Sequence, residues 1–283
     1  MKILSFDIED WFHILDIGDT NSRDKWSFFE SRIEARLVAV IRDLKDRDYS
    51  ATFFVLGWVA KKYPHLIKLL SDEGFHIGSH SYSHELVYEN SRMHFHDDLC
   101  RSIDIIEGLT NKKVDCYRAP GFSITECTKW YVDELIAQGI KIDSSIFPAA
   151  RGHGGFASFG EVGPSLIERN GNFLKEFPIN STSFFGYKYI FSGGGYFRLF
   201  PEWLLNFHFR RNDYSMTYFH LRDFDDEQPR LPMNWLRSFK SYYGLSGAWG
   251  KYLNIIDRFD FCDVRAADQM IDWSSCNVLN FND

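Results

Sequence analysis

Short apolar runs alternate with longer segments of helical periodicity along most of the chain. The short runs are rich in β-branched and aromatic residues, and the longer segments repeat an apolar residue every three or four positions. This alternation is typical of an α/β protein with a mainly parallel sheet and crossover helices. We predict strands at 3–8, 51–56, 75–78, 114–117, 140–142, 174–179 and 216–221, and helices at 34–47, 59–73, 93–108, 125–138, 201–211, 232–243 and 248–259.

Two segments lack this periodicity. The glycine-rich stretch at 147–171 is expected to be a long surface loop. The segment Gly193–Arg198 begins with three glycines, and it is either a loop where the backbone approaches a substrate or a plain tight turn. Neither segment has the length or composition of a linker, so the 283 residues are expected to form a single domain.

Charge and composition narrow the possible partners. The net charge of −7 and the absence of any Lys/Arg-rich run argue against nucleic acid and anionic membrane surfaces. The five cysteines are widely spaced, with no CxxC pair, which favours reduced thiols. The N-terminus becomes acidic before a signal-peptide core can form, and no apolar run reaches about 18 residues. We therefore expect a cytoplasmic protein without membrane insertion, of unknown oligomeric state.

Polar, chemically capable side chains follow five of the predicted strands. They are the acids of 7–10, the pair His80 and His84, then Arg118, Asp143 and His220. The carboxyl ends of parallel strands meet at one edge of a sheet, where the sites of such folds collect. The sequence therefore predicts one site that draws on all five strand ends.

The most specific of these groups is His80-Ser-Tyr-Ser-His84. If the segment forms one helical turn, positions i and i+4 share a face, and both imidazoles can bind one cation. A catalytic zinc usually takes three protein ligands and keeps one position open for water. The acidic cluster Asp7-Ile8-Glu9-Asp10 can supply the third ligand.

In this order the motifs resemble those of the polysaccharide deacetylase (NodB-homology) superfamily of carbohydrate esterases. The resemblance covers about residues 1–225, and a C-terminal helical extension of the same domain would occupy about 226–283. It implies a distorted (β/α) barrel with seven or eight strands. The variant acidic motif is similar to that of subgroups with intracellular members. The matching blocks are Ser5–Asp10, Ala51–Gly57, His80–His84, Arg118–Gly121 and Phe219–Leu221.

The resemblance also implies roles for these residues. Asp7 would be the general base, with Arg118 holding it through a bidentate contact, and His220 would be the general acid. The family's Asp-Trp motif is replaced here by Ile142-Asp143-Ser144-Ser145, so Asp143 is the expected partner that orients His220. The expected metal ligands are His80, His84 and either Glu9 or Asp10, which the sequence does not separate, and the expected substrate-binding residues are Tyr82, Pro120 and Gly121.

These roles predict a metal-dependent hydrolase that removes an N-acetyl group from a sugar in a glycan or polysaccharide pathway. The expected cofactor is a divalent metal, with Zn²⁺ the leading candidate, and the expected partner is an N-acetylated carbohydrate. One alternative is a hydrolase of a cyclic amide or ureide, which the same superfamily includes. The other is a catalytically inactive glycan-binding protein that keeps the barrel.

Overall fold

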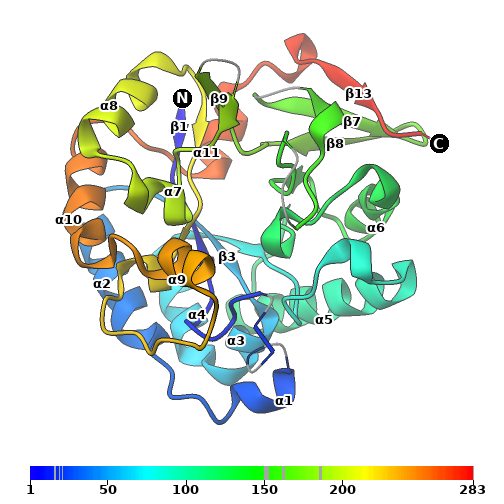
Figure 1. Ribbon diagram of the computed structural model, residues 1–283. Helices are drawn as coiled ribbons and strands as arrows, with labels where there is room; N and C mark the ends of the chain where they lie inside the picture. Colours follow the sequence, from blue (N-terminus) through cyan, green and yellow to red (C-terminus); the bar gives the residue numbers. More distant parts are fainter. Residues whose placement is uncertain are drawn as a thin grey trace.

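A nine-stranded sheet forms the centre of the protein (Figure 1). The computed structural model describes residues 1–15, 17–18, 20, 22–149, 153–160, 163–184 and 187–282. Neighbouring strands are parallel from one end of the sheet as far as its seventh strand. These seven are, in spatial order, β12 (Phe219–His220), β2 (Ser5–Ile8), β3 (Thr52–Val55), β4 (His76–Ser79), β5 (Cys116–Tyr117), β6 (Ile142–Asp143) and β8 (Asn172–Glu176).

The remaining strands extend the parallel part of the sheet or pair outside it. β7 (Ser165–Arg169) is antiparallel to β8, and β13 (Val278–Asn280) pairs with the outer edge of β7. β1 (Lys2–Ile3) and β11 (Ser215–Met216) form a parallel pair that leads into β2 and β12. Within the described residues β12 and β13 do not pair with each other, so the barrel stays open there. The predicted α/β fold, a distorted barrel, is confirmed. A separate antiparallel pair consists of β9 (Thr182–Phe184) and β10 (Tyr187–Tyr189).

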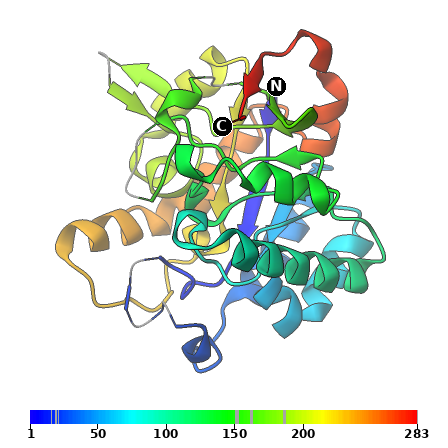
Figure 2. The same ribbon diagram turned by 90° about the vertical axis from the view of Figure 1, so that its right-hand side faces the viewer.

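Helices pack around the outside of the sheet (Figures 1 and 2). Apolar residues of the sheet fill the layer beneath them, and the Phe6 and Phe53 rings of adjacent strands stack at 5.3 Å between centroids. The helices are α1 (Arg23–Trp26), α2 (Ile33–Asp46), α3 (Gly57–Lys62), α4 (Pro64–Asp72), α5 (Arg92–Thr110), α6 (Tyr131–Ala137), α7 (Gly194–Leu199), α8 (Glu202–Arg211), α9 (Trp235–Tyr242), α10 (Leu245–Ile256) and α11 (Val264–Met270), with 3₁₀ turns η1 (Val87–Glu89), η2 (Pro120–Phe122), η3 (Glu126–Thr128), η4 (Ala157–Phe159), η5 (Leu221–Phe224) and η6 (Trp273–Ser275).

Proline divides one predicted helix into two. The segment 59–73 was expected to be continuous, but α3 ends at Lys62 and α4 begins at Pro64. Proline lacks an N–H and disfavours the helical conformation in the residue before it. Tyr63 accordingly has φ −128° and ψ 61°, and Pro64 occupies the first turn of α4.

The expectation of a surface loop at 147–171 is wrong for its C-terminal part, while 150–152 and 161–162 lie outside the described residues. β7 occupies 165–169, and its buried positions alternate with half-buried ones against β8. Asn170 and Gly171 connect the two strands with φ values of 51° and 77°. Asn-Gly between two strands is a strong hairpin signal, and it was available in the sequence.

The C-terminal segment is not wholly helical. α9 and α10 confirm the two predicted helices, but β13 returns to the sheet and covers the edge of β7, which would otherwise leave backbone groups unpaired. The division into a core of about 1–225 and an extension stays a prediction. Among the helices that the structure describes, none combines the length and the apolar character needed to cross a bilayer.

Close packing at Gly78 in β4 gives a test of the sheet. A Cβ atom there would lie 2.8 Å from the Phe54 ring and 2.9 Å from the backbone oxygen of Cys116. We expect Gly78→Ala to lower the free energy of unfolding by about 1–3 kcal/mol through overpacking. Gly108 in α5 has no atom within 4 Å of the same position. Gly108→Ala should instead stabilise by about 0.5–1 kcal/mol. Chemical denaturation measures both, and equal effects of the two changes would contradict the predicted close packing.

Candidate active site

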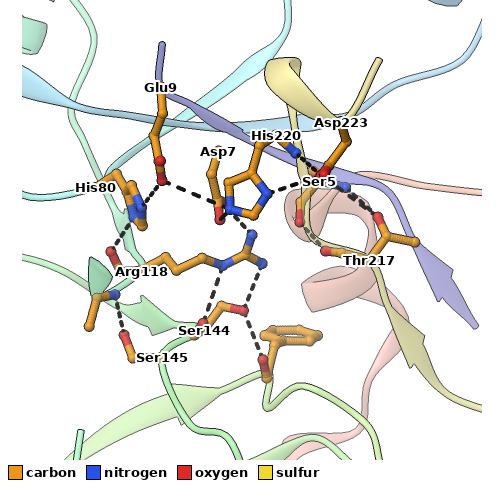
Figure 3. A network of polar contacts seen from close by, with 12 residues as sticks. Ser5, Asp7, Glu9, His80, Arg118, Ser144, Ser145, Thr217, His220 and Asp223 are labelled. Carbon is orange, nitrogen blue, oxygen red and sulfur yellow. Dashed lines mark hydrogen bonds and ion pairs between the residues drawn. The ribbon is translucent and has the colours of Figure 1, made fainter. Parts of the chain in front are cut away.

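The carboxyl ends of β2, β4 and β12 bring carboxylates and imidazoles together at one edge of the sheet (Figure 3). His220 of β12 lies directly beside Asp7 of β2 in the strand register. His80 follows the last residue of β4, and Glu9 follows the last residue of β2. Arg118 follows β5 and reaches back toward Asp7. Four of the five predicted strand ends therefore meet at one place.

Glu9 joins the two histidines of the HxxxH motif. Its Oε1 atom lies 3.0 Å from His80 Nε2 and 2.9 Å from His84 Nε2, and all three side chains are buried. His80 Nδ1 lies 2.8 Å from the carbonyl oxygen of Arg118, which fixes the ring with Nε2 toward Glu9. Burial opposes ionisation of Glu9, but the charge of His84 and the hydrogen bonds from both rings outweigh it, so its pKa falls well below the ordinary value.

The segment that carries the two histidines is an irregular loop rather than the helical turn assumed from the spacing. Ser81 and His84 both have positive φ, at 63° and 56°. Asp98 of α5 holds the loop, because its carboxylate accepts the backbone N–H groups of Tyr82 at 2.7 Å and Ser83 at 2.9 Å. Both rings nevertheless meet at Glu9, because this fixed loop backbone, and not a helical turn, directs them there.

Of the two candidate acids, the structure brings Glu9 and not Asp10 to the histidines. The carboxylate of Asp10 accepts hydrogen bonds from the Ser31 hydroxyl and from the backbone N–H groups of Trp11 and Arg32. These contacts point the Asp10 carboxylate toward the adjoining loop and away from the histidines. Burial raises the pKa of Asp10 above its ordinary value.

Arg118 is fully buried and pairs with Asp7. Its Nη1 lies 2.7 Å from Asp7 Oδ1, while Nη2 and Nε donate to the hydroxyl and carbonyl oxygens of Ser144 at 3.1 and 3.3 Å. The guanidinium also lies over the Phe54 ring, 4.0 Å from its centroid. The contact with Asp7 is single rather than the bidentate one expected, because the other N–H groups are used by Ser144.

Asp143 does not contact His220, and the prediction that it orients this histidine is wrong. Asp143 lies at the end of β6, and four strands separate β6 from β12 in the sheet. Its carboxylate accepts hydrogen bonds from the hydroxyls of Tyr131 at 2.8 Å and Ser145 at 2.5 Å. It also lies beside the buried Glu176 of β8. Asp143 is therefore part of the packing between β6, β8 and α6.

Asp223 takes the place expected of Asp143. Its Oδ2 lies 3.1 Å from His220 Nδ1 and accepts the backbone N–H of His220 at 3.0 Å. His220 Nε2 then faces the carboxylates of Asp7, at 3.7 Å, and Glu9, at 4.0 Å. The signal that was missed is an acid three residues after the histidine, in Phe-His-Leu-Arg-Asp.

These charges shift the pKa values of His220 and Asp223 in opposite directions. Burial disfavours the charged form of His220, but the hydrogen bond to Asp223 and the charge of Glu9 outweigh it and raise its pKa to about 9. Burial likewise opposes ionisation of Asp223. The charge of Arg198 and the hydrogen bond with His220 overcome it and lower the pKa of Asp223 to about 2.

The three expected substrate-binding residues lie in different surroundings. The Tyr82 ring is buried beneath the guanidinium of Arg101, which lies 3.7 Å from the ring centroid. The side chain therefore packs between α3 and α5, and substrate contact at Tyr82 stays a prediction. Pro120 is buried, whereas Gly121 is partly exposed, with φ 61°. Substrate contact at Pro120 and Gly121 stays a prediction.

Two overlapping groups of side chains in the described part of the chain have the ligand atoms for a metal ion. One is Glu9, His80 and His84, and the other is Asp7, Glu9 and His220, with all ligand atoms of each group within 4.8 Å of one another. Two imidazole nitrogens and one carboxylate oxygen form a donor set that suits Zn²⁺. The fixed orientation of the His80 ring fits the same use.

Comparisons with known proteins identify relatives of this chain. The polysaccharide deacetylase family model matches residues 18–139, and a model described as a domain of unknown function (DUF3473) matches residues 144–269. A peptidoglycan-N-acetylglucosamine deacetylase of Bacillus cereus is 26% identical over 117 residues, covering 37% of this chain and 42% of the relative. The peptidoglycan-N-acetylmuramic acid deacetylase PdaA of Bacillus subtilis is 30% identical over 105 residues, covering 37% and 40%.

The fold has a counterpart among solved structures. A crystal structure of a Mycobacterium smegmatis protein provisionally assigned to the polysaccharide deacetylases superposes with a TM-score of 0.66, at 14% identity, over 98% of this chain and 91% of that one. The matched part of the chain, residues 18–139, belongs to the polysaccharide deacetylase superfamily. It matches about two fifths of the length of the two curated relatives described above.

The buried pair of Asp143 and Glu176 predicts a pH effect on stability. Burial raises the pKa of both carboxyl groups, and the Asp143 charge helps to raise that of Glu176 well above its ordinary value. The folded state therefore keeps a proton that the unfolded chain releases above its own pKa of about 4.3. The stabilisation that comes from this bound proton is fully present below the unfolded-state pKa. It is lost as the pH rises through the higher pKa of the folded state.

We expect Glu176→Gln, which stays a neutral donor at every pH, to remove this loss. Urea denaturation of the original protein and the variant between about pH 5 and about pH 8 measures the free energy of unfolding. The difference should move in favour of the variant as the pH rises. Parallel curves would show that the pair does not share a proton.

Proposed function

We propose that this chain is a metal-dependent deacetylase that hydrolyses the N-acetyl group of a sugar residue in a glycan. The observation that carries the proposal is the cluster of Glu9, His80 and His84, which faces Asp7 and His220 at the mouth of the barrel. Glu9, His80 and His84 would hold the divalent cation, with Zn²⁺ the expected ion. When bound, it would polarise the amide carbonyl and lower the pKa of a bound water toward about 7.

Asp7 is the base in this proposal. Its Oδ1 atom accepts a hydrogen bond from Arg118, and its second oxygen, Oδ2, is free of that contact and faces His220. A carboxylate in this position accepts a proton from the attacking water. Arg118 holds the carboxylate in place through its own contacts with Ser144.

His220 is the acid. Amide hydrolysis breaks the C–N bond, and the departing nitrogen is a poor leaving group until it is protonated. Asp223 holds Nδ1 of His220, so Nε2 is the nitrogen that faces the reacting centre. General acid catalysis of this kind typically contributes about 10²–10⁴ in rate.

The relatives support the substrate class. Both curated relatives described above are named as deacetylases of peptidoglycan sugars, N-acetylglucosamine in one and N-acetylmuramic acid in the other. Their shared chemistry is an acetamido group on a hexose ring. We assign that group, within a glycan or polysaccharide pathway, as the substrate of this chain.

Acetate release from a panel of N-acetylhexosamines, as monomers and as oligomers, tests the function. We expect release that a chelator abolishes and added Zn²⁺ restores, and a loss of at least about 10²-fold in His80→Ala, which lacks one metal ligand. Release of ammonia or ring-opened product from cyclic amides, with no acetate from any sugar, would favour the alternative hydrolase. Glycan binding without turnover would favour an inactive binding protein.

The choice between Glu9 and Asp10 predicts a difference in metal affinity. Glu9→Gln removes the carboxylate shared by the two histidines and should weaken Zn²⁺ binding by at least about 10²-fold, more than changes outside the ligand set usually cause. Asp10→Asn is the matched control, because its hydrogen bonds lie in the adjoining loop, and it should leave the affinity unchanged. Competition with a chromophoric chelator measures both. Weak binding in Asp10→Asn alone would reverse the assignment.

A further inference from the structure

The Gly193–Arg198 segment is packed against the strand that carries His220. Gly193 forms a bridge with Tyr218, and a Cβ atom on Gly193 would lie 2.2 Å from the Tyr218 carbonyl oxygen. Gly194 has φ 53° and donates its N–H to the same carbonyl at 3.2 Å. Only glycine fits the first of these positions without moving the backbone. The glycines therefore start α7 directly beside the residues that lead into His220.

Arg198, at the end of this segment, connects α7 to Asp223. Its side chain is 4% exposed, and its Nε atom lies 3.1 Å from Asp223 Oδ1. Asp223 thus uses its two oxygens for two different partners, Oδ1 for Arg198 and Oδ2 for His220. A carboxylate held at both oxygens cannot rotate about its axis without losing one contact.

The rest of the guanidinium is fixed by the C-terminal end of α9. Nη1 donates to the carbonyl oxygens of Ser241 at 2.9 Å and Tyr243 at 3.0 Å, and Nη2 donates to that of Lys240 at 3.2 Å. Carbonyl groups at a helix C-terminus lack partners within the helix and carry partial negative charge. The positive charge of Arg198 therefore neutralises both this helix end and the Asp223 carboxylate. Movement of either group would break its contact with the guanidinium.

We propose that Arg198 is a positioning residue of the catalytic acid: it holds Asp223 so that Nε2 of His220 stays aimed at the departing nitrogen. The inference rests on the proposed deacetylase function, in which His220 protonates the amine. It gives the glycine-rich segment a role in the chemistry without any contact with the substrate.

Two substrates separate this role from a merely structural one. When an N-acetyl group is hydrolysed, the C–N bond breaks, its electron pair goes to nitrogen, and the nitrogen takes the proton from His220. When 4-nitrophenyl acetate is hydrolysed, the C–O bond breaks and the phenolate leaves with its electron pair, without needing a proton. Misplacement of the acid should slow the first reaction and spare the second.

We expect Arg198→Met to lower kcat for an N-acetylhexosamine oligomer by about 10–10²-fold, a part of the 10²–10⁴ that an acid contributes. KM and the hydrolysis of 4-nitrophenyl acetate should change little. Arg198→Lys keeps the charge but cannot reach Asp223 and three carbonyls together, so it should recover the activity only in part. A crystal structure of Arg198→Met should show the His220 ring turned from its position beside Asp7.

Arg169→Met is the matched control. Arg169 is also buried, and it also pairs with a carboxylate, Asp133, and donates to a carbonyl, that of Phe281, but it lies on β7. Its loss should lower stability and leave the ratio of amide to ester hydrolysis unchanged. Parallel losses of both activities in Arg198→Met, or no loss of either, would overturn the proposal.

A double-mutant cycle covers the case in which Arg198→Met folds poorly. Asp223→Asn should itself lower amide hydrolysis, and adding Arg198→Lys should then cost less than it does in the original protein, because the two residues act through one contact. Fully additive losses would contradict the proposal. If the original protein releases no acetate from any sugar, the proposed function fails. The orientation of His220 in the variant structure then still tests the contact itself.

Discussion

Two imidazole rings share one buried carboxylate oxygen of Glu9, and the positions of the other charged groups follow from this contact. A carboxylate removed from water is costly unless it has charged or hydrogen-bonding partners. His80 and His84 provide them, and a loop with two positive φ angles holds both rings in place. Asp98, 16 residues after Tyr82 along the chain, fixes that loop through two backbone N–H groups. The site therefore depends on a residue of α5 that lies outside every motif.

Charge balance extends from Glu9 across the mouth of the barrel. Asp7 and Glu9 are two buried acids close to His220, and each needs a cation or donor on its other side. Arg118 pairs with Asp7, and the two histidines contact Glu9. His220 is held on its far side by a third acid, Asp223, which Arg198 balances in turn. Acidic and basic side chains therefore alternate from Glu9 through His220 and Asp223 to Arg198 of α7. Each of them contacts the next one in this series.

The sequence was sufficient for the parts of the site that are carried by strand ends. Asp7, His80, Arg118 and His220 follow apolar runs, and parallel pairing places the ends of these runs at one edge. The sequence also predicted the barrel and most of its helices. It did not separate Glu9 from Asp10, because two acids in consecutive positions look alike until hydrogen bonds from Ser31, Trp11 and Arg32 occupy one of them.

The partner of His220 was missed for a physical reason that applies beyond this residue. A role assigned from the order of motifs assumes that each motif keeps its place in the sheet, and β6, which carries Asp143, is separated from β12 by four strands. The requirement itself is only for an oxygen within hydrogen-bonding distance of Nδ1. An acid three residues after the histidine meets it, because η5 turns the chain back on itself at once. The position of an acid in the folded protein decides whether it can hold His220. A short turn after the histidine places Asp223 within reach of Nδ1, whereas Asp143 on a distant strand is too far away.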